Sequence, residues 1–322
     1  MNNEKTIVKM IFGSHLYGTS TPDSDKDFKG VFLPTKEQIF LGKIPKVLPT
    51  DEPKRKKAEG EKNTADDVDT EIYSLHYFIK LACEGQTVAL DMLHAPDAMI
   101  LESSDIWTAI VANRDKFYTK NLKAFVGYAR RQVAKYGIKS SRLNSAKEFV
   151  SLLGQHKSND KLSTIWELLP LDDHCYHLGL NKNNINQYQI CGKIFQETTR
   201  IGHTLEIMQK FTEQYGKRAI EAAQNKNIDW KSVSHALRAA YQVHELLTEN
   251  TITFPLRRAP FLKEVKQGKL DYLTEVAPIL EALMDEVEIL SENSTLPEKP
   301  DRKFWDQFII DAIENDQWRI QV

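Results

Sequence analysis

The sequence has few cysteines, no long apolar run and almost no net charge. Its three cysteines lie far apart among 322 residues, which excludes a disulfide framework and suits a reducing compartment. No apolar run approaches the roughly 20 residues that a membrane-spanning helix needs, and the N-terminus lacks the pattern of a signal peptide. The formal net charge of -2 excludes a strong overall attraction to nucleic acid or anionic lipid. We therefore expect a cytoplasmic protein without membrane contact, long enough for two domains.

The most informative stretch lies near the N-terminus. An apolar run over 7–12, which predicts a strand, leads into Gly13 and Ser14, and a turn-rich segment then leads to Asp25 and Asp27. Residues i and i+2 of a strand point to the same side, so these carboxylates repel each other unless a cation lies between them. A glycine and a serine at a strand-to-helix turn can offer backbone N–H groups and a hydroxyl to a phosphate. Together these features indicate nucleotidyl transfer.

Period-two alternation predicts a further strand over 68–73. This strand would place Asp67, Asp69 and Glu71 on one side. If it lies beside the strand that follows Asp25, either Asp69 or Glu71 could supply a third carboxylate and act as general base for the attacking hydroxyl. Carboxylates of this kind are the oxygen ligands that Mg²⁺ prefers.

The remaining chain divides by composition and periodicity. Residues 43–67 contain three prolines and the basic run 54–57, which predicts a mobile exposed loop or, alternatively, a clamp on a polyanionic substrate. Beyond about residue 105 most of the pattern is helical. The predicted fold class is α+β: a small mixed β-sheet in a nucleotidyltransferase domain over 1–110, followed by a mostly α-helical substrate-binding domain over 111–322.

The N-terminal motif resembles the DNA polymerase β-type nucleotidyltransferase superfamily, whose hallmark is Gly-Ser followed by Asp-x-Asp. More narrowly, it resembles the predicted RNA-repair-associated nucleotidyltransferases of the RlaP family, which occur in bacteria and phages. The matching segments are Gly-Ser-His-Leu-Tyr-Gly-Thr over 13–19, Ser-Asp-Lys-Asp over 24–27 and Gly-Val-Phe over 30–32. Asp69 matches the third-carboxylate strand of that family, and Asp91 begins an Asp-Met-Leu segment where the family often has Glu-x-Leu.

The resemblance implies transfer of a nucleoside monophosphate from an NTP to a hydroxyl, with release of pyrophosphate. The implied cofactor is a pair of Mg²⁺ ions, or Mn²⁺, held by Asp25, Asp27 and Asp69. The implied acceptor is an RNA end, with tRNA as one candidate. The residues expected to bind the nucleotide are Gly13, Ser14, Tyr17, Thr19 and Ser24 in the motif and Lys231, His235 and Arg238 on one face of a later helix.

A basic neighbourhood with interleaved tyrosines predicts contacts to an RNA backbone. Its residues are Arg130, Arg131, Lys135 and Arg142, although surface helices often carry as many charges. Two further functions stay open: nucleotidylation of a protein, as in toxin-like members of the superfamily, and a catalytically silent RNA- or nucleotide-binding module. The intact acids argue against the silent module, because a binding protein need not keep clustered like charges.

Overall fold

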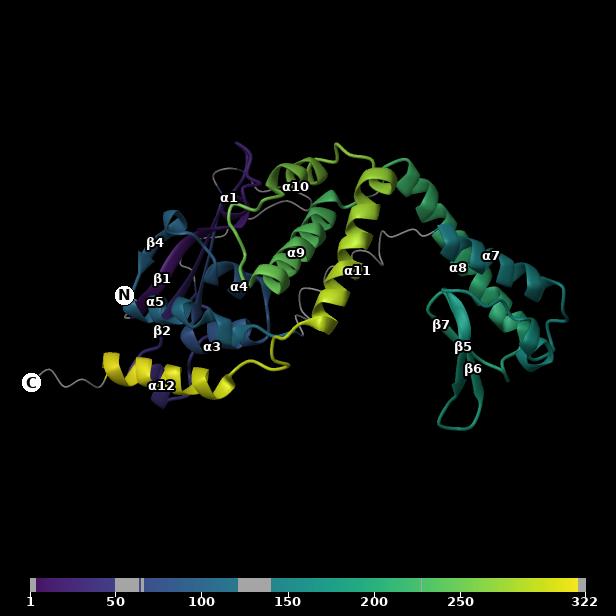
Figure 1. Cartoon of the computed structure of the whole chain (residues 1–322), viewed down its shortest axis with the longest axis horizontal. Helices are drawn as coiled ribbons and strands as arrows, with labels where there is room; N and C mark the ends of the chain where they lie inside the picture. The colour runs from purple at the N-terminus through teal and green to yellow at the C-terminus, as the bar shows by residue number, and fades with distance from the viewer. Residues whose placement is uncertain (1–3, 50–63, 65–66, 121–139, 227, 318–322) are drawn as a thin grey trace, which may run out of the picture. The chain divides into compact units, whose positions relative to one another are not determined.

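The chain divides into two compact units in the computed structural model, which describes residues 4–49, 64, 67–120, 140–226 and 228–317. Unit 1 comprises residues 1–132, 230–270 and 278–322, and unit 2 comprises residues 133–229 and 271–277. Figure 1 labels the elements of both units. By length and hydropathy, none of the helices among the described residues could span a membrane.

A four-stranded mixed sheet in the order β3-β2-β1-β4 forms the centre of unit 1. Its strands are β1 (Lys5–Phe12), β2 (Lys26–Leu33), β3 (Val68–Ser74) and β4 (Ile100–Ser103). β1 runs antiparallel to β2 and β4, whereas β2 and β3 are parallel. The three strands predicted from the sequence are confirmed. β4 is an addition, because its four residues are too few to show a period.

Unit 1 also contains helices from both halves of the sequence. They are α1 (Gly13–Tyr17), α2 (Lys36–Phe40), α3 (Leu75–Cys83), α4 (Thr87–Leu93), α5 (Asp105–Ala112), α9 (Trp230–Glu249), α10 (Ala259–Lys266), α11 (Ala277–Asn293) and α12 (Arg302–Gln317), with short 3₁₀ turns at Asp97–Met99 and Arg114–Phe117. The apolar face of α3 is buried, and Phe78 meets Trp107 of α5 edge to face at 5.4 Å between ring centroids. On another side α12 lies next to α3 (Figure 1), and its buried Trp305 stacks on Phe117 at 3.9 Å.

Unit 2 has its own core. It contains α7 (Ser140–Gly154), a 3₁₀ segment (Leu162–Leu168), β5 (Cys175–Leu180), β6 (Asn186–Ile190), β7 (Lys193–Gln196), α8 (Ile201–Ala223) and a π-helical turn (Tyr272–Val276). The strands form an antiparallel sheet in the order β5-β6-β7, and Phe149, Tyr188 and Met208 are among its fully buried side chains. The predicted fold class, a mixed sheet followed by a mostly helical region, is confirmed.

The division into units does not follow the predicted boundary near residue 110. α9, α10 and α12 come from the helical half of the sequence but belong to unit 1, because their buried apolar faces pack with the N-terminal elements. Such long-range packing leaves no mark in local composition. The functional assignment of 1–110 to catalysis and of 111–322 to substrate binding stays a prediction.

Part of the segment predicted as a mobile loop is ordered against the sheet. The Leu48 N–H donates to the Ile72 carbonyl (2.9 Å), and the Ser74 N–H donates to the Lys46 carbonyl (3.0 Å). The free edge of β3 thus gains a partner for its polar backbone groups. Residues 46–48 thus form an isolated bridge to β3 within the predicted loop, and the mobility of 43–67 stays a prediction. The basic run 54–57 lies outside the described residues.

Candidate active site

Carboxylates gather where β2 and β3 begin. The parallel register pairs Asp27 directly with Asp69, so the two side chains leave the sheet on the same face, and Asp25 stands two residues before Asp27. Burial raises the pKa of the Asp27 carboxyl, and the charges of Asp25 and Asp69 raise it further. The three acids are therefore close enough to repel one another, which is the arrangement that a bound cation relieves.

Glu71 of β3 forms hydrogen bonds with other residues. Its Oε2 accepts hydrogen bonds from Lys29 Nζ and from the Tyr73 hydroxyl, both at 2.6 Å. The register pairs Glu71 with Lys29 in the same way that it pairs Asp69 with Asp27. Of the two acids that the sequence left open, Asp69 is the one beside the Asp25–Asp27 pair.

The glycine-serine turn lies directly against this acid pair. Phe12, the last residue of β1, is paired with Asp27, and Gly13 then turns with a φ of +63°. A Cβ atom added to Gly13 would lie 1.9 Å from Asp27 Oδ2, so only glycine leaves room for the carboxylate there. The neighbouring Ser14 Oγ is buried without a hydrogen-bond partner among the described residues. An unsatisfied buried hydroxyl beside an acid pair fits a group that binds a ligand oxygen.

Backbone and side-chain bonds shape the segment between the glycine-serine turn and the acids. The Thr19 N–H donates to the Ser14 carbonyl at 2.9 Å, just after Gly18 caps the end of α1. Thr19 is buried, and Ser24 Oγ accepts the Thr21 N–H at 2.9 Å. Thr19 and Ser24 therefore belong to the loop that carries Asp25. Their contact with a nucleotide stays a prediction.

Tyr17 and Arg238 converge on Asp91 of α4, a residue to which the sequence assigned no role. The Tyr17 hydroxyl donates to Asp91 Oδ2 at 2.9 Å, and Arg238 Nη1 donates to the same oxygen at 3.0 Å. Gln242 Nε2 donates to Asp91 Oδ1 at 2.6 Å. The Asp91 side chain is fully buried; its burial raises the pKa of its carboxyl, while the Arg238 charge opposes that shift. Besides the match of Asp91 to the Glu-x-Leu position of the resembled family, the sequence contained one physical signal: Asp91 is the single charge in an apolar helix, and a buried charge needs a partner.

Lysines from the C-terminal half face the acids. The Lys231 charge, from the start of α9, lowers the pKa of Asp27. Lys266 of α10 belongs to the same group of charges, because burial and Lys231 lower its pKa while Asp25 and Asp27 raise it. Lys263, three residues earlier, donates from Nζ to the Ser20 carbonyl at 2.9 Å. Sequence reasoning missed Lys263 and Lys266 because it did not predict α10.

The roles of the other predicted binding residues stay predictions. His235 is half-buried on α9, and its role stays a prediction. Arg142, in unit 2, donates to the Cys191 carbonyl and lies 5.7 Å from the centroids of the Phe211 and Tyr215 rings. Its predicted contact with RNA is untested. Arg130, Arg131 and Lys135 lie outside the described residues.

The oxygen-rich donors at this site fit a magnesium ion that the substrate helps to bind. Across the described ranges, no three His, Cys, Asp or Glu side chains are arranged to hold a metal by themselves. Magnesium is commonly bound by one or two carboxylates together with substrate phosphates and water. Asp25 and Asp27 supply such a pair, and the pKa of Asp27 is raised first by burial and then by the negative charges of Asp25 and Asp69.

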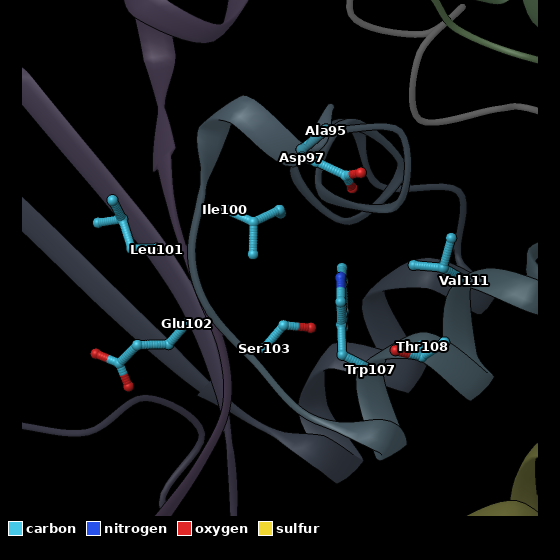
Figure 2. Close-up of a pocket in the computed structure, with 9 residues that line it drawn as sticks. All are labelled: Ala95, Asp97, Ile100, Leu101, Glu102, Ser103, Trp107, Thr108 and Val111. Carbon is cyan, nitrogen blue, oxygen red and sulfur yellow. The ribbon is translucent and has the colours of Figure 1, made fainter.

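A separate pocket of about 460 Å³ is lined in part by β4. Figure 2 shows its lining side chains, which come from β4, from α5 and from the segment before β4, with the Trp107 ring standing between α5 and the strand. The polar side chains in this lining are Asp97, Glu102, Ser103 and Thr108. None of the predicted site residues lines it, so this pocket is distinct from the acid site.

Comparison with known proteins agrees with this geometry. The family described as "RlaP: RNA repair pathway DNA polymerase beta family" matches residues 2–152. The chain is also 37% identical over 327 residues to the "Uncharacterized 38.9 kDa protein in nrdC-mobD intergenic region" of Enterobacteria phage T4, an alignment that covers 95% of this chain and 96% of that protein. No solved structure matches the chain significantly.

Proposed function

This chain belongs to the RNA repair pathway DNA polymerase beta family, RlaP, and on that premise we propose that it is a metal-dependent nucleotidyltransferase. In the proposed reaction a nucleoside monophosphate passes from an NTP to a hydroxyl at an RNA end, with tRNA as one candidate acceptor, and pyrophosphate is released. Family membership supports the reaction class and the link to RNA repair.

One observation carries the proposal: the Asp27 carboxylate lies against the Gly13 turn while Asp25 and Asp69 crowd it with like charge. Repulsion of this kind destabilises a protein unless the cluster serves to bind a cation. The buried Ser14 hydroxyl, without a partner among the described residues, lies at the same turn. A phosphate oxygen would satisfy it.

Each residue then has a chemical role. Asp25, Asp27 and Asp69, together with phosphate oxygens of the substrate and water, would hold Mg²⁺ or Mn²⁺, which when bound neutralises phosphate charge and lowers the pKa of the attacking hydroxyl. Asp69 accepts the proton of that hydroxyl as the acceptor oxygen bonds to the α-phosphorus. The bond from the α-phosphorus to the oxygen that bridges the β-phosphate breaks, and its electron pair leaves with pyrophosphate. Ser14 and Lys231 hold the phosphates during this exchange.

The direct test is transfer of label from each α-³²P NTP, with Mg²⁺ or Mn²⁺, in the presence of total RNA or of a protein extract. Label in RNA supports the proposal, whereas label in protein favours protein nucleotidylation. The absence of transfer with every NTP, metal and acceptor would favour the silent binding module.

The site assignment needs its own variants. Asp25→Asn together with Asp27→Asn should abolish transfer, as should removal of the metal by EDTA. Asp23→Asn is the matched control, because Asp23 is an exposed acid two residues away in the same loop. Transfer that survives in the double variant would refute the assignment.

A further inference from the structure

The charged network around Asp91 joins three elements that meet near the proposed active site. Asp91 belongs to α4, Tyr17 is the last residue of α1, and Arg238 and Gln242 belong to α9. The Arg238 guanidinium also lies 4.1 Å from the centroid of the Tyr17 ring, a cation–π contact that adds to the two hydrogen bonds on Asp91 Oδ2. Arg238 Nη1 further donates to Gln242 Oε1 at 3.0 Å. Every partner in the network is thus held by at least two others.

The elements in this network carry the two sides of the active site. α1 begins with Gly13 and Ser14, and α9 begins beside Lys231, whose charge acts on Asp27. Lys231 and Arg238 are seven residues apart, which is about two turns or roughly 10 Å along a helix. The contact of Arg238 with Asp91 therefore sets the position of α9 along its axis, and with it the place of Lys231.

A second contact supports the same end of α1. The Leu256 N–H donates to the Tyr17 carbonyl at 3.2 Å. A Cβ atom added to Gly18 would lie 2.8 Å from Pro255 Cβ, so the chain after α9 packs closely on the turn that ends α1. The backbone of Tyr17 is held from one side and its hydroxyl from the other, which leaves α1 little freedom to move away from α9.

We propose that Asp91 is a positioning residue that keeps Lys231 of α9 opposite the Gly13–Ser14 turn through Tyr17 and Arg238, so that the phosphates of the NTP meet both at once. This inference rests on the proposed nucleotidyl transfer. Asp91 is fully buried and acts through these partners without touching substrate. A carboxylate that served stability alone would not change how much Lys231 contributes to the reaction.

A double-mutant cycle tests this coupling. In the otherwise unchanged chain, Lys231→Ala should lower kcat/KM for the NTP by about tenfold or more, mainly through KM. In an Asp91→Asn background the same change should have an effect of less than about threefold, because Lys231 is no longer held in place. Tyr17→Phe keeps the ring over Arg238 and removes only the bond to Asp91, so it should reduce the Lys231 effect to an intermediate value.

Tyr118→Phe is the matched control. The Tyr118 hydroxyl is also buried, and it bonds His94 Nε2 at 2.9 Å just after α4, but none of its described contacts reaches α1 or α9. The full effect of Lys231→Ala should persist in this background. Equal effects of Lys231→Ala in all four backgrounds would overturn the proposal, and so would a Lys231→Ala variant with unchanged kinetics.

Hydrogen exchange of the metal-free chain separates this proposal from the reaction itself. Asp91→Asn and Tyr17→Phe should each speed amide exchange over 13–20 and over the first turns of α9, while exchange in α12 stays unchanged. The Tyr118→Phe variant should show no faster exchange in either region. If the unaltered chain transfers no nucleotide, the proposed function fails. The amide exchange rates alone then show whether Asp91 positions α1 and α9. Unchanged exchange over 13–20 in both variants would refute that role even if transfer is observed.

Discussion

Replacement of Gly13 by alanine tests whether the close approach of the glycine turn to Asp27 matters for the reaction. The added Cβ would lie 1.9 Å from Asp27 Oδ2, and real Cβ atoms essentially never come within 3.0 Å of another heavy atom. The carboxylate must therefore move by about 1 Å, since the Gly13 backbone is fixed by the pairing of Phe12 with Asp27. The φ of +63° adds backbone strain.

The two effects have different magnitudes and appear in different measurements. A left-handed backbone at a residue with a Cβ costs roughly 1–2 kcal/mol, which should lower the free energy of unfolding by that amount. A displacement of about 1 Å in a group that holds the reacting atoms costs about 100-fold in rate. We therefore expect Gly13→Ala to remain folded at 25 °C and to lose about 100-fold in kcat/KM.

Gly42 provides the control for the backbone term. It has the same φ of +63°, but an added Cβ would meet no atom of the described residues within 4 Å. Gly42→Ala should lose about 1–2 kcal/mol in urea unfolding and keep its transfer activity. The reasoning is refuted if Gly13→Ala transfers label from an α-³²P NTP as fast as Gly42→Ala does.

Three further predictions concern the acids, a buried histidine and the last helix. Asp69→Asn should lower kcat by about 100-fold or more. Glu71→Gln removes the charge that Lys29 pairs with, so it should lower the free energy of unfolding by about 1 kcal/mol and keep most activity. Equal losses of activity in the two variants would contradict the inference, drawn from the strand register, that Asp69 and not Glu71 belongs to the acid site. Burial lowers the pKa of His94 from 6.5 to about 4, so the unfolded chain takes up this proton at a higher pH than the folded chain does. In urea unfolding, the free energy of unfolding should therefore fall by about 3 kcal/mol between pH 7 and 4, and this fall should be absent in His94→Gln. Trp305→Ala empties a fully buried site and should cost about 3–5 kcal/mol by the same measurement, so a loss below 1 kcal/mol would show that α12 packs loosely.

The N-terminal part of the site was predictable because it is local. An apolar strand, a turn with glycine, and two acids in alternation follow one another within 27 residues, and each has a period or a turn chemistry of its own. The structure confirms β1, α1 and β2 at those places. The closeness of Asp27 to Asp69 also follows from the assumption, made from the sequence, that the third strand lies beside the second.

What the sequence did not show depends on contacts between distant residues. α10 has only eight residues and buries Ala259, Leu262 and Val265, so its helical spacing covers little more than two turns and is hard to recognise in the sequence. The alternation of β5 is hidden because five of its six residues are exposed and no apolar side stands out. Asp91 showed its charge in the sequence, but nothing near it identified Arg238 as the partner.

The pairing of Asp91 with Arg238 also governs when this protein can finish folding. Synthesis proceeds from the N-terminus, so Asp91 leaves the ribosome well before Arg238 does. Until then the Asp91 carboxylate lacks its cation, and full burial of the kind seen in the completed fold would leave an unpaired charge. Unit 1, built from three separate segments, can close only when the last third of the chain has been made. An unfinished chain therefore carries the acids of the site without the lysines that face them.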